Sequence, residues 1–444
     1  MSDLSFVSVR GNRAYNTVLR PDFQLYFEAS KNVYHAVDNP EGSFPLNVAD
    51  NKLNWDKLRE KLQFISATKE IPEWVSGYTS GLGHETFRDA LAKFLSTFLA
   101  HHPLDPENIG IAAGATAVIE LSALILADAG DVAVFPAPSY PVYSRDINNK
   151  AGLERYDLIT HHQINDSNQG AILSIEHLEI AKKDIERQGK NFRLLVLTNP
   201  DNPTGSIYTL AQLESIAEWC IKRKIHLIVN EIYGLVVLDT EHPSIAGDYS
   251  DHQMFTSILP VIHKKNSPYL HQWYALSKDL GISGMRVGSV YSLNQAFLSA
   301  FNNLNLPHMV SNHTQWLMEN VLTDHDFMRD FLDAQKLSLT KGYIVVINTL
   351  KKLNISFVPS YGSLFIWADF SKFLSEDTLN SETLFWEQLY KNTGVLLTPG
   401  LGFGHTKKGM FRIVYTCFDN QALQVAMTRI ENYLKTLSSL EINT

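Results

Sequence analysis

Short apolar runs alternate with amphipathic helical stretches in the central part of this chain. Four of these runs predict buried strands, at residues 132–135, 194–198, 225–229 and 270–276. Between the second and third runs, apolar residues recur at helical spacing over residues 210–221. A strand, a helix and a strand in this rhythm predict parallel crossovers. We therefore expect an α/β fold with a mostly parallel sheet between helices, and ligands at the carboxyl ends of its strands.

The pattern changes after Pro307. Residues 315–352 predict long helices, and strand-like runs follow at 356–370, 394–398 and 411–418. A helix lies between the first two runs and another follows the third, which together predict a smaller α+β domain. The first 45 residues show little periodicity and predict an arm that joins the small domain or another subunit. The expected parts are an N-terminal arm over 1–45, a large domain over 46–315 and a small C-terminal domain over 316–444.

Composition narrows the class of protein. With 444 residues, 45% of them hydrophobic, the chain can fill the cores of two domains. Its net charge of −9 is spread along the sequence, which argues against nucleic acid or an anionic membrane as the main partner. Cys220 and Cys417 lie far apart without metal-ligand spacing, so we expect no disulfide framework and no metal site. We find no signal peptide or membrane-spanning run and expect a cytoplasmic protein.

The most informative position is Lys278, which follows an apolar, strand-like run just before several glycines. Lysines normally lie on solvated surfaces, so this setting is unusual. A lysine that forms a Schiff base must be partly desolvated, because its neutral amine has to exist near neutral pH. Arg286 follows at a spacing of eight, lowers the lysine pKa and offers a planar fork to a phosphate. The segment predicts a cofactor-anchoring lysine beside a phosphate-binding arginine.

Small, aromatic or amide residues lie at other predicted strand ends. Residues 113–117 open a helical run, where free amides and the Thr116 hydroxyl could hold an anion. Tyr140 precedes a proline, a position from which an aromatic ring can lie over a planar ligand. The turn 199–205 carries amide side chains that could bind a ligand, although turn chemistry alone also explains them. Taken singly, each segment has an ordinary structural explanation.

Two further segments complete a set. Asn230 and Tyr233 follow the third predicted strand, where polar side chains point into the ligand crevice. Arg412 lies alone in an apolar strand of the small domain, and its guanidinium could grip a carboxylate with two hydrogen bonds. Five weak signals in this order and at these spacings rarely coincide, so we interpret them as one site.

With these segments the chain resembles the class I/II aminotransferases, which are fold-type I pyridoxal-phosphate enzymes. Within that family it is most similar to members of the 1-aminocyclopropane-1-carboxylate synthase type. The motifs that carry the resemblance are Asn-Pro-Glu-Gly at 39–42, Ala-Asp-Asn at 49–51, Ala-Gly-Ala-Thr-Ala at 113–117, Tyr-Pro with Arg-Asp within 140–146, and Ser-Lys-Asp-Leu-Gly at 277–281. Together they are specific for the fold and much less specific for the reaction.

The resemblance implies a role for each candidate residue. It makes Lys278 the Schiff-base lysine and proton shuttle at the substrate's α-carbon, with Tyr233 as a second catalytic residue. The residues it assigns to pyridoxal 5'-phosphate are Gly114, Ala115, Thr116, Tyr140, Asn202, Asn230, Tyr233, Ser277, Lys278, Arg286 and Tyr78, the last reaching the neighbouring site of a homodimer. The residues it assigns to the substrate are Arg412, which binds the α-carboxylate, Asp50 and Asn202.

The chain departs from the family pattern at a few of these positions. Asn230 stands where the family has an aspartate paired with the pyridine nitrogen, and an amide supplies no negative charge. We therefore expect a lower pyridine pKa, a weaker electron sink and slower transamination. Ala275 replaces a serine that usually contacts the phosphate, a loss of about 1 kcal/mol. Asp50 replaces a glutamate of the synthases, and the neighbouring Lys52 disfavours a cationic substrate such as S-adenosylmethionine.

Three functions remain open from the sequence. The favoured one is an aminotransferase acting on an α-amino acid and a keto acid. The second is a 1-aminocyclopropane-1-carboxylate synthase-like lyase that runs an α,γ- or β-elimination. The third is a cofactor-binding relative with little catalysis, which Asn230 favours and the retained Lys278 and Arg412 oppose.

Overall fold

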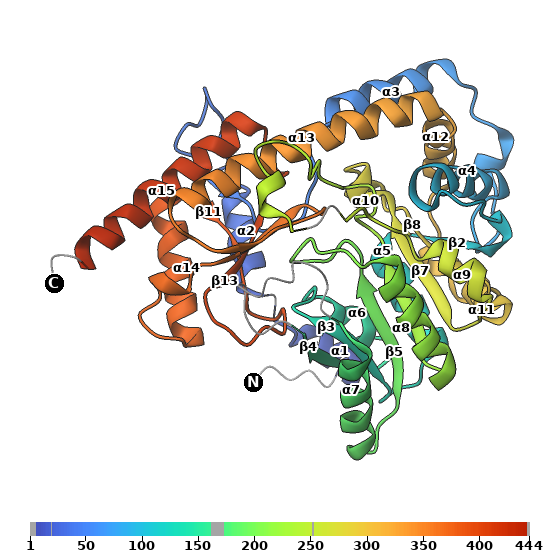
Figure 1. Cartoon of the computed structure of the whole chain (residues 1–444). Coiled ribbons are helices and arrows are strands. Elements are labelled where there is room, and N and C mark those ends of the chain that lie inside the picture. Colours follow the sequence, from blue (N-terminus) through green and yellow to red (C-terminus); the bar gives the residue numbers. More distant parts are fainter. Residues whose placement is uncertain (1–5, 19, 161–172, 251–252, 442–444) are drawn as a thin grey trace.

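The computed structural model describes residues 6–18, 20–160, 173–250 and 253–441. A larger body built around a seven-stranded sheet lies beside a smaller body that carries the C-terminus (Figure 1). The long helix α13 (His325–Lys352) runs from one body to the other. This is the α/β architecture that the sequence predicts.

The large sheet has the strand order β2, β8, β7, β6, β5, β3, β4. The strands are β2 (Ile109–Ala112), β3 (Val132–Ala137), β4 (Glu154–Ile159), β5 (Phe192–Thr198), β6 (His226–Asn230), β7 (Leu270–Ala275) and β8 (Gly288–Ser292). Only β8 runs antiparallel to its neighbours β2 and β7, and the other pairs are parallel. The four predicted strands are confirmed as β3, β5, β6 and β7. They are neighbours in the sheet, so their carboxyl ends meet at one edge.

Helices cover the large sheet, and further helices pack beyond one end of it (Figure 1). Those in contact with its strands are α4 (Glu85–Leu95), α5 (Ala115–Leu126), α6 (Tyr143–Asn148), α7 (Ile175–Arg187), α8 (Leu210–Arg223), α9 (Leu259–Lys265) and α11 (Gln295–Leu304). Helix α12 (Asn312–Leu322) packs on α4, and α3 (Trp55–Thr68) packs on α12. In α8, Leu213, Ile216 and Cys220 recur at helical spacing and are buried, as the sequence predicts. Thr209 and Gln212 form a capping box that fixes the start of this helix.

Short helical turns complete the larger body and the connections. They are η1 (Glu73–Ser76), η2 (Ser96–Ala100), η3 (Pro106–Asn108), η4 (Ala246–Asp248), α10 (Leu276–Asp279), η5 (Ser283–Met285), η6 (Leu306–His308) and η7 (Ser371–Phe373). Of these, α10 and η5 flank the candidate site.

The smaller body packs an antiparallel sheet against helices. Its sheet has the order β12 (Thr398–Pro399), β13 (Met410–Val414), β10 (Phe365–Asp369), β9 (Phe357–Val358), and its helices are α14 (Leu379–Thr393), α15 (Asn420–Glu441) and the end of α13. The predicted strand at 356–370 divides into β9 and β10, because the backbone turns at Ser363 with a φ of +72°. The run at 394–398 divides into β11 (Val395–Leu396) and β12.

The N-terminal region contains two helices that the sequence does not predict, α1 (Val9–Tyr15) and α2 (Pro21–Ala29). Helix α1 buries no side chain and α2 buries only Asp22 and Ala29, so neither carries an apolar stripe for the sequence to reveal. Further along, β1 (Phe44–Pro45) pairs in parallel with β11 of the smaller body. The domain limits 1–45, 46–315 and 316–444 remain a proposal, and the division at 315/316 falls inside α12.

Candidate active site

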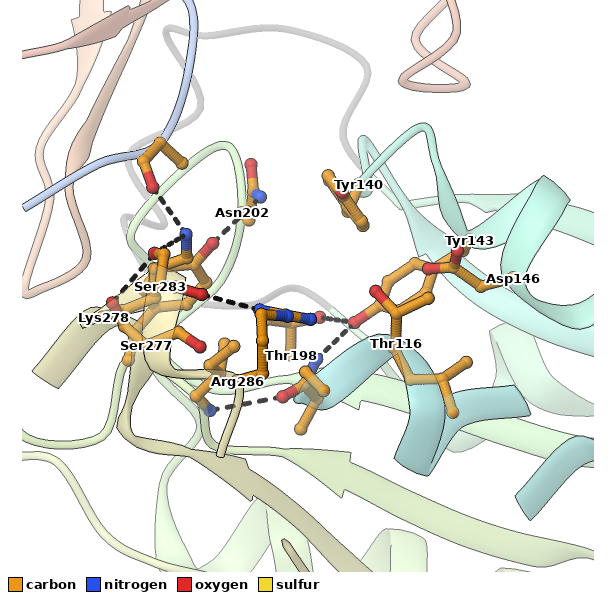
Figure 2. A pocket seen from close by; sticks show the side chains of 16 residues that line it. Thr116, Tyr140, Tyr143, Asp146, Thr198, Asn202, Ser277, Lys278, Ser283 and Arg286 are labelled. Atoms are coloured by element: carbon orange, nitrogen blue, oxygen red, sulfur yellow. Dashed lines mark hydrogen bonds between the residues drawn. The ribbon is translucent and has the colours of Figure 1, made fainter. Parts of the chain in front are cut away.

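A cavity of about 150 Å³ lies where β3, β5, β6 and β7 end (Figure 2). Its lining consists of Ala49, Ala115, Thr116, Ile119, Tyr140, Tyr143, Asp146, Thr198, Asn202, Asn230, Ile232, Tyr233, Ser277, Lys278, Ser283 and Arg286. All the predicted cofactor residues are present in this lining except Gly114 and Tyr78. The structure therefore brings together segments that are up to 171 residues apart in the sequence at the sheet edge where ligands are expected.

Lys278 lies in α10, the single helical turn that follows β7. Its Nζ donates hydrogen bonds to the carbonyl oxygen of Ala49 at 2.6 Å and to Ser283 Oγ at 3.2 Å. The Asn51 side chain donates to the Lys278 carbonyl oxygen at 2.9 Å and so fixes the backbone of the turn. The amine is held in place without a carboxylate bonded to it, which leaves it available for chemistry.

The electrostatic environment of Lys278 favours the neutral amine. Burial lowers the pKa of Lys278 to about 8, with smaller contributions from the positive charges of Arg412 and Arg286. Asp50 acts in the opposite direction. The depressed pKa is the one that a Schiff-base lysine needs, but burial contributes more to it than Arg286, the residue that the sequence points to.

Arg286 and the turn before α5 form one end of the site. Arg286 donates to the carbonyl oxygens of Ser283 at 2.8 Å and Ala113 at 3.4 Å. Gly114 joins β2 to α5 with a φ of +89°, and a Cβ there would lie 2.1 Å from a guanidinium nitrogen of Arg286. The backbone therefore favours glycine, and a larger residue would also push the guanidinium of Arg286 out of its present position. The first amides of α5, Thr116 and Arg286 together offer donors that suit an anion.

Arg412 and Asn202 form a second polar group beside the cavity. Arg412 donates to Asn202 Oδ1 at 2.9 Å, to the Asn47 carbonyl oxygen at 2.7 Å and to Thr398 Oγ1 at 3.3 Å. Burial lowers the pKa of Arg412 to about 10, and its Nε is a buried donor without a partner among the described residues. Asn202 in turn donates to the Tyr233 hydroxyl at 3.3 Å. A buried guanidinium without a carboxylate partner is suited to bind the carboxylate of a substrate.

Asn230 belongs to a hydrogen-bonded chain that the sequence does not reveal. Its Nδ2 donates to the Tyr143 hydroxyl at 2.8 Å, and its Oδ1 accepts from the backbone N–H of Ile232 at 3.2 Å. The Tyr143 and Thr198 hydroxyls are 3.0 Å apart. Thr198 is the last residue of a predicted strand, and Tyr143 follows Tyr140 by three residues. Thr198 could have been found by asking which side chains share the strand ends with Asn230, whereas Tyr143 lies in α6 and has no such signal.

Tyr140 and Asp146 are also part of the wall. The Tyr140 ring meets the Tyr143 ring edge to face, with centroids 5.3 Å apart and an interplanar angle of 85°. Burial and the neighbouring Glu120 raise the pKa of Asp146 to about 7, against the charge of Arg145. In the sequence, Asp146 stands out only as part of the Arg-Asp motif within 140–146, and its place in the lining comes from the structure.

Four predicted residues lie outside the cavity lining: Gly114 and Arg412, which are described above, and Tyr78 and Asp50. Tyr78 is 98% exposed and lies just after η1, so it contributes nothing to the site of its own chain. Asp50 is close enough to raise the Lys278 pKa, but its carboxylate is not part of the wall.

Comparison with known sequences decides the family. The sequence profile of the family described as aminotransferase class I and II matches residues 45–430. The chain belongs to the class I and II aminotransferase family. It is 29% identical over 425 residues to 1-aminocyclopropane-1-carboxylate synthase 1 of Prunus mume, covering 94% of this chain and 83% of that protein. It is 30% identical over 423 residues to 1-aminocyclopropane-1-carboxylate synthase 1 of Oryza sativa subsp. indica, covering 92% of this chain and 84% of that protein.

Solved structures of aminotransferases share the fold. An archaeal alanine:glyoxylate aminotransferase superposes with a TM-score of 0.80 at 17% identity, covering 98% of this chain and 100% of that chain. A double mutant of Thermus thermophilus aspartate aminotransferase superposes with a TM-score of 0.75 at 17% identity, covering 96% and 99% of the two chains. The protein is therefore a fold-type I, pyridoxal-phosphate-dependent enzyme of the aminotransferase family.

The residues of the site fit this cofactor. Arg286 and the start of α5 would hold the phosphate, at the point where a Cβ at Gly114 would fill the space that the arginine needs. The amine of Lys278 would take the carbonyl, and the amide of Asn202 and the hydroxyl of Tyr233 would bond the phenolic oxygen. The end of the cavity at Arg286 thus suits an anion such as the phosphate. The other end, with its neutral polar side chains, suits the atoms of the ring.

Other classes of site are not found in the described part of the chain. No group of three or more His, Cys, Asp or Glu within it could hold a metal ion. None of its helices combines the length and the apolar character that crossing a bilayer requires. Cys220 and Cys417 are both free and buried.

Proposed function

We propose that the protein is an aminotransferase that passes the amino group of an α-amino acid to a keto-acid acceptor. The observation that carries the proposal is the pairing of two buried cationic side chains with different tasks. Arg412 has a spare buried donor and no carboxylate partner, while Lys278 has a pKa of about 8 and no bonded counter-ion. Such a pair can hold an amino acid by its α-carboxylate and move the proton of its α-carbon.

In this proposal each side of the cavity has one task. Arg286, Ser277 and the residues 114–116 hold the phosphate, and Tyr140 covers the ring and excludes water. Asn202 and Tyr233 bond the phenolic oxygen, with Tyr233 as a catalytic residue. Pyridoxal phosphate, when bound, supplies an electron-withdrawing ring that stabilises negative charge at the substrate's α-carbon. Lys278 carries the proton on and off that carbon, and Asp50, Asn202 and Arg412 orient the substrate.

A panel of α-amino acids tests the proposal. The protein is purified with pyridoxal phosphate, and its absorption band is followed as each amino acid is added. Conversion of the band to that of the amine form, with release of the matching keto acid, is the expected result. If no amino acid moves the band, the aminotransferase proposal is wrong. Lys278→Ala should abolish the band.

Arg412→Lys tests the carboxylate site in the same assay. The lysine keeps the charge but loses the planar fork, so we expect kcat/KM to fall by about tenfold to a hundredfold, mostly through KM. Arg429→Lys is the matched control, because Arg429 binds the carbonyl oxygens of Gly42 and Thr393 away from the cavity. Equal effects of the two substitutions would show that Arg412 does not bind the substrate's carboxylate.

The second candidate function is a lyase of the 1-aminocyclopropane-1-carboxylate synthase type. The synthases named above favour it, since they match more than nine tenths of this chain. The exposed Lys52 beside Asp50 weighs against it, because a cationic S-adenosylmethionine would meet a positive charge. Adding S-adenosylmethionine to the holoenzyme discriminates the two: a cyclic amino acid or a released thioether supports the lyase. A band that no substrate moves supports the third candidate, a cofactor-binding relative with little catalysis.

We also propose a homodimer in which Tyr78 reaches the neighbouring site. Its 98% exposure supports this proposal, since a large aromatic side chain that the described part of its own chain leaves uncovered is available to another subunit. A cytoplasmic location remains a prediction from the low cysteine content.

A further inference from the structure

The direction of the hydrogen bonds around Asn230 can be assigned from chemistry alone. A backbone N–H can only donate, so the atom that meets the Ile232 N–H at 3.2 Å is the Asn230 oxygen. The other amide atom is therefore the nitrogen, which donates to the Tyr143 hydroxyl at 2.8 Å. The Tyr143 oxygen accepts this bond, and its hydroxyl shares a second hydrogen bond with the Thr198 hydroxyl, 3.0 Å away, in which either group can donate.

The bonds link Asn230, Tyr143 and Thr198 in a row. Whichever hydroxyl donates to the other, two hydrogens are left over, one on the Asn230 amide and one on the hydroxyl that accepts. All three side chains line the cavity and are at least nine-tenths buried. This group, which we call the neutral floor (Tyr143, Thr198 and Asn230), offers donors and carries no negative charge.

The cofactor's own geometry brings its ring nitrogen to this floor. In the pyridine ring the nitrogen lies opposite the carbon that bears the carbonyl group. Lys278, which takes the carbonyl, lies at one end of the cavity, and Tyr143 lies at the other (Figure 2). The ring nitrogen of a cofactor anchored on Lys278 therefore points toward the neutral floor.

We propose that the neutral floor holds the ring nitrogen of the cofactor in its unprotonated form, with Tyr143 and Thr198 as positioning residues that aim the Asn230 amide at it as a donor. An unprotonated nitrogen is an acceptor and matches a leftover hydrogen of the floor. A protonated nitrogen would be a buried cation with no anionic partner, which burial disfavours.

Two carboxyl groups near the floor are candidates for the missing charge, and neither is hydrogen-bonded to Asn230, Tyr143 or Thr198 among the described residues. Burial raises the pKa of Asp201 to about 7, and its carboxylate is engaged by the hydroxyl of Thr204 at 2.6 Å. Asp146 lines the cavity, but no described hydrogen bond joins it to Asn230, Tyr143 or Thr198. Asp146 is the one acidic side chain of the cavity lining and so must be tested directly.

The protonation state can be measured without turnover. The apoprotein is loaded with pyridoxal phosphate carrying ¹⁵N in the ring, and the nitrogen chemical shift is compared with those of the free cofactor in acid and in base. We expect the unprotonated shift in the wild type and in Asp146→Asn, and the protonated shift in Asn230→Asp. A protonated nitrogen in the wild type overturns the proposal, and its loss in Asp146→Asn would identify Asp146 as the counter-ion instead.

The positioning role is tested by Tyr143→Phe and Thr198→Val. Either change frees the amide to rotate, so cofactor affinity should fall by about fivefold, the effect of one neutral hydrogen bond. Tyr291→Phe is the matched control, because the Tyr291 hydroxyl also accepts from an asparagine amide, that of Asn108 at 3.4 Å, outside the cavity. Unchanged affinity in Tyr143→Phe and Thr198→Val, or an equal loss in Tyr291→Phe, contradicts the role.

This inference rests on the proposed cofactor site but not on the proposed reaction. If no amino acid is transaminated, the ¹⁵N chemical shift still reports whether the ring nitrogen at the neutral floor is protonated. If transamination is observed with a protonated nitrogen, the reaction proposal stands and the neutral floor is wrong.

Discussion

The state of Lys278 depends on a balance between burial and neighbouring charge. Water is replaced around its amine by the Ala49 carbonyl oxygen and the Ser283 hydroxyl, two neutral partners. The resulting pKa of about 8 leaves about a tenth of the amine neutral at neutral pH. That fraction is enough for reaction with a carbonyl group, because proton exchange is fast.

The rate of cofactor attachment should follow this pKa. Only the neutral amine attacks a carbonyl, so the rate should rise about tenfold per pH unit below pH 8 and level off above it. Stopped-flow absorbance of apoprotein mixed with pyridoxal phosphate measures this rate of attachment. Asp50→Asn should move the midpoint to lower pH, because Asp50 raises the Lys278 pKa. A midpoint near the ordinary lysine value of 10.5 would contradict the assignment.

Asn230→Asp should raise the rate of transamination. A carboxylate would give the ring nitrogen a charged partner, and the gain over a neutral bond is on the order of 1 kcal/mol, about fivefold in rate. The measurement is kcat with the best amino acid of the panel. Asn149→Asp, at an exposed position, controls for the added charge. An equal or lower rate in Asn230→Asp would show that the electron sink does not limit the reaction.

At the scale of elements, the turn between β2 and α5 places the strictest requirement on a single residue, Gly114. Gly114→Ala would strain a backbone with a φ of +89° and displace the Arg286 guanidinium. Gly130→Ala is the matched control, since Gly130 has a φ of +90° and nothing within 4 Å of its added Cβ. Both should lose similar stability in thermal unfolding. Only Gly114→Ala should weaken cofactor binding, by about tenfold or more, as measured by titration of the apoprotein.

The sequence predicts the parallel interior strands well and the other strands of the large sheet poorly. The strands β3, β5, β6 and β7 are continuous apolar runs, because both faces of a parallel sheet are covered. In contrast, β4 at the sheet edge buries only Leu158 of its six residues, and β2 has only four residues including Gly110. Interior β8 is also missed, because Ser289 and Ser292 interrupt its apolar pattern although both are buried.

The same limit applies to the site. Residues that act at strand ends, such as Asn202 and Asn230, are found from position alone. The partner of Asn230 is not, because Tyr143 lies 87 residues away and only the packing of α6 against the sheet brings it near. Hydrogen-bond partners between distant segments depend on tertiary structure, which a local pattern does not contain.

At the scale of the whole molecule, the proposed homodimer can be tested by mixing subunits. If Tyr78 serves the neighbouring site, subunits with Tyr78→Ala and subunits with Lys278→Ala each make defective dimers. A mixed dimer should contain one site with both Lys278 and Tyr78, so co-expression should restore tight cofactor binding to about half of the mixed dimers' sites. Light scattering checks the mass. No restoration in confirmed dimers would mean that Tyr78 has no such role.

Helix α13 has a consequence for anyone who wishes to redesign this enzyme. Asn51, whose amide holds the Lys278 backbone, also donates to Gln335 Oε1 at 2.9 Å, and Gln335 is a buried residue of α13. The same helix continues into the core of the smaller body. Mutational libraries confined to the cavity wall will therefore miss positions that affect the site from outside it. Substitutions around Gln335 can shift the anchoring lysine although they contact no ligand.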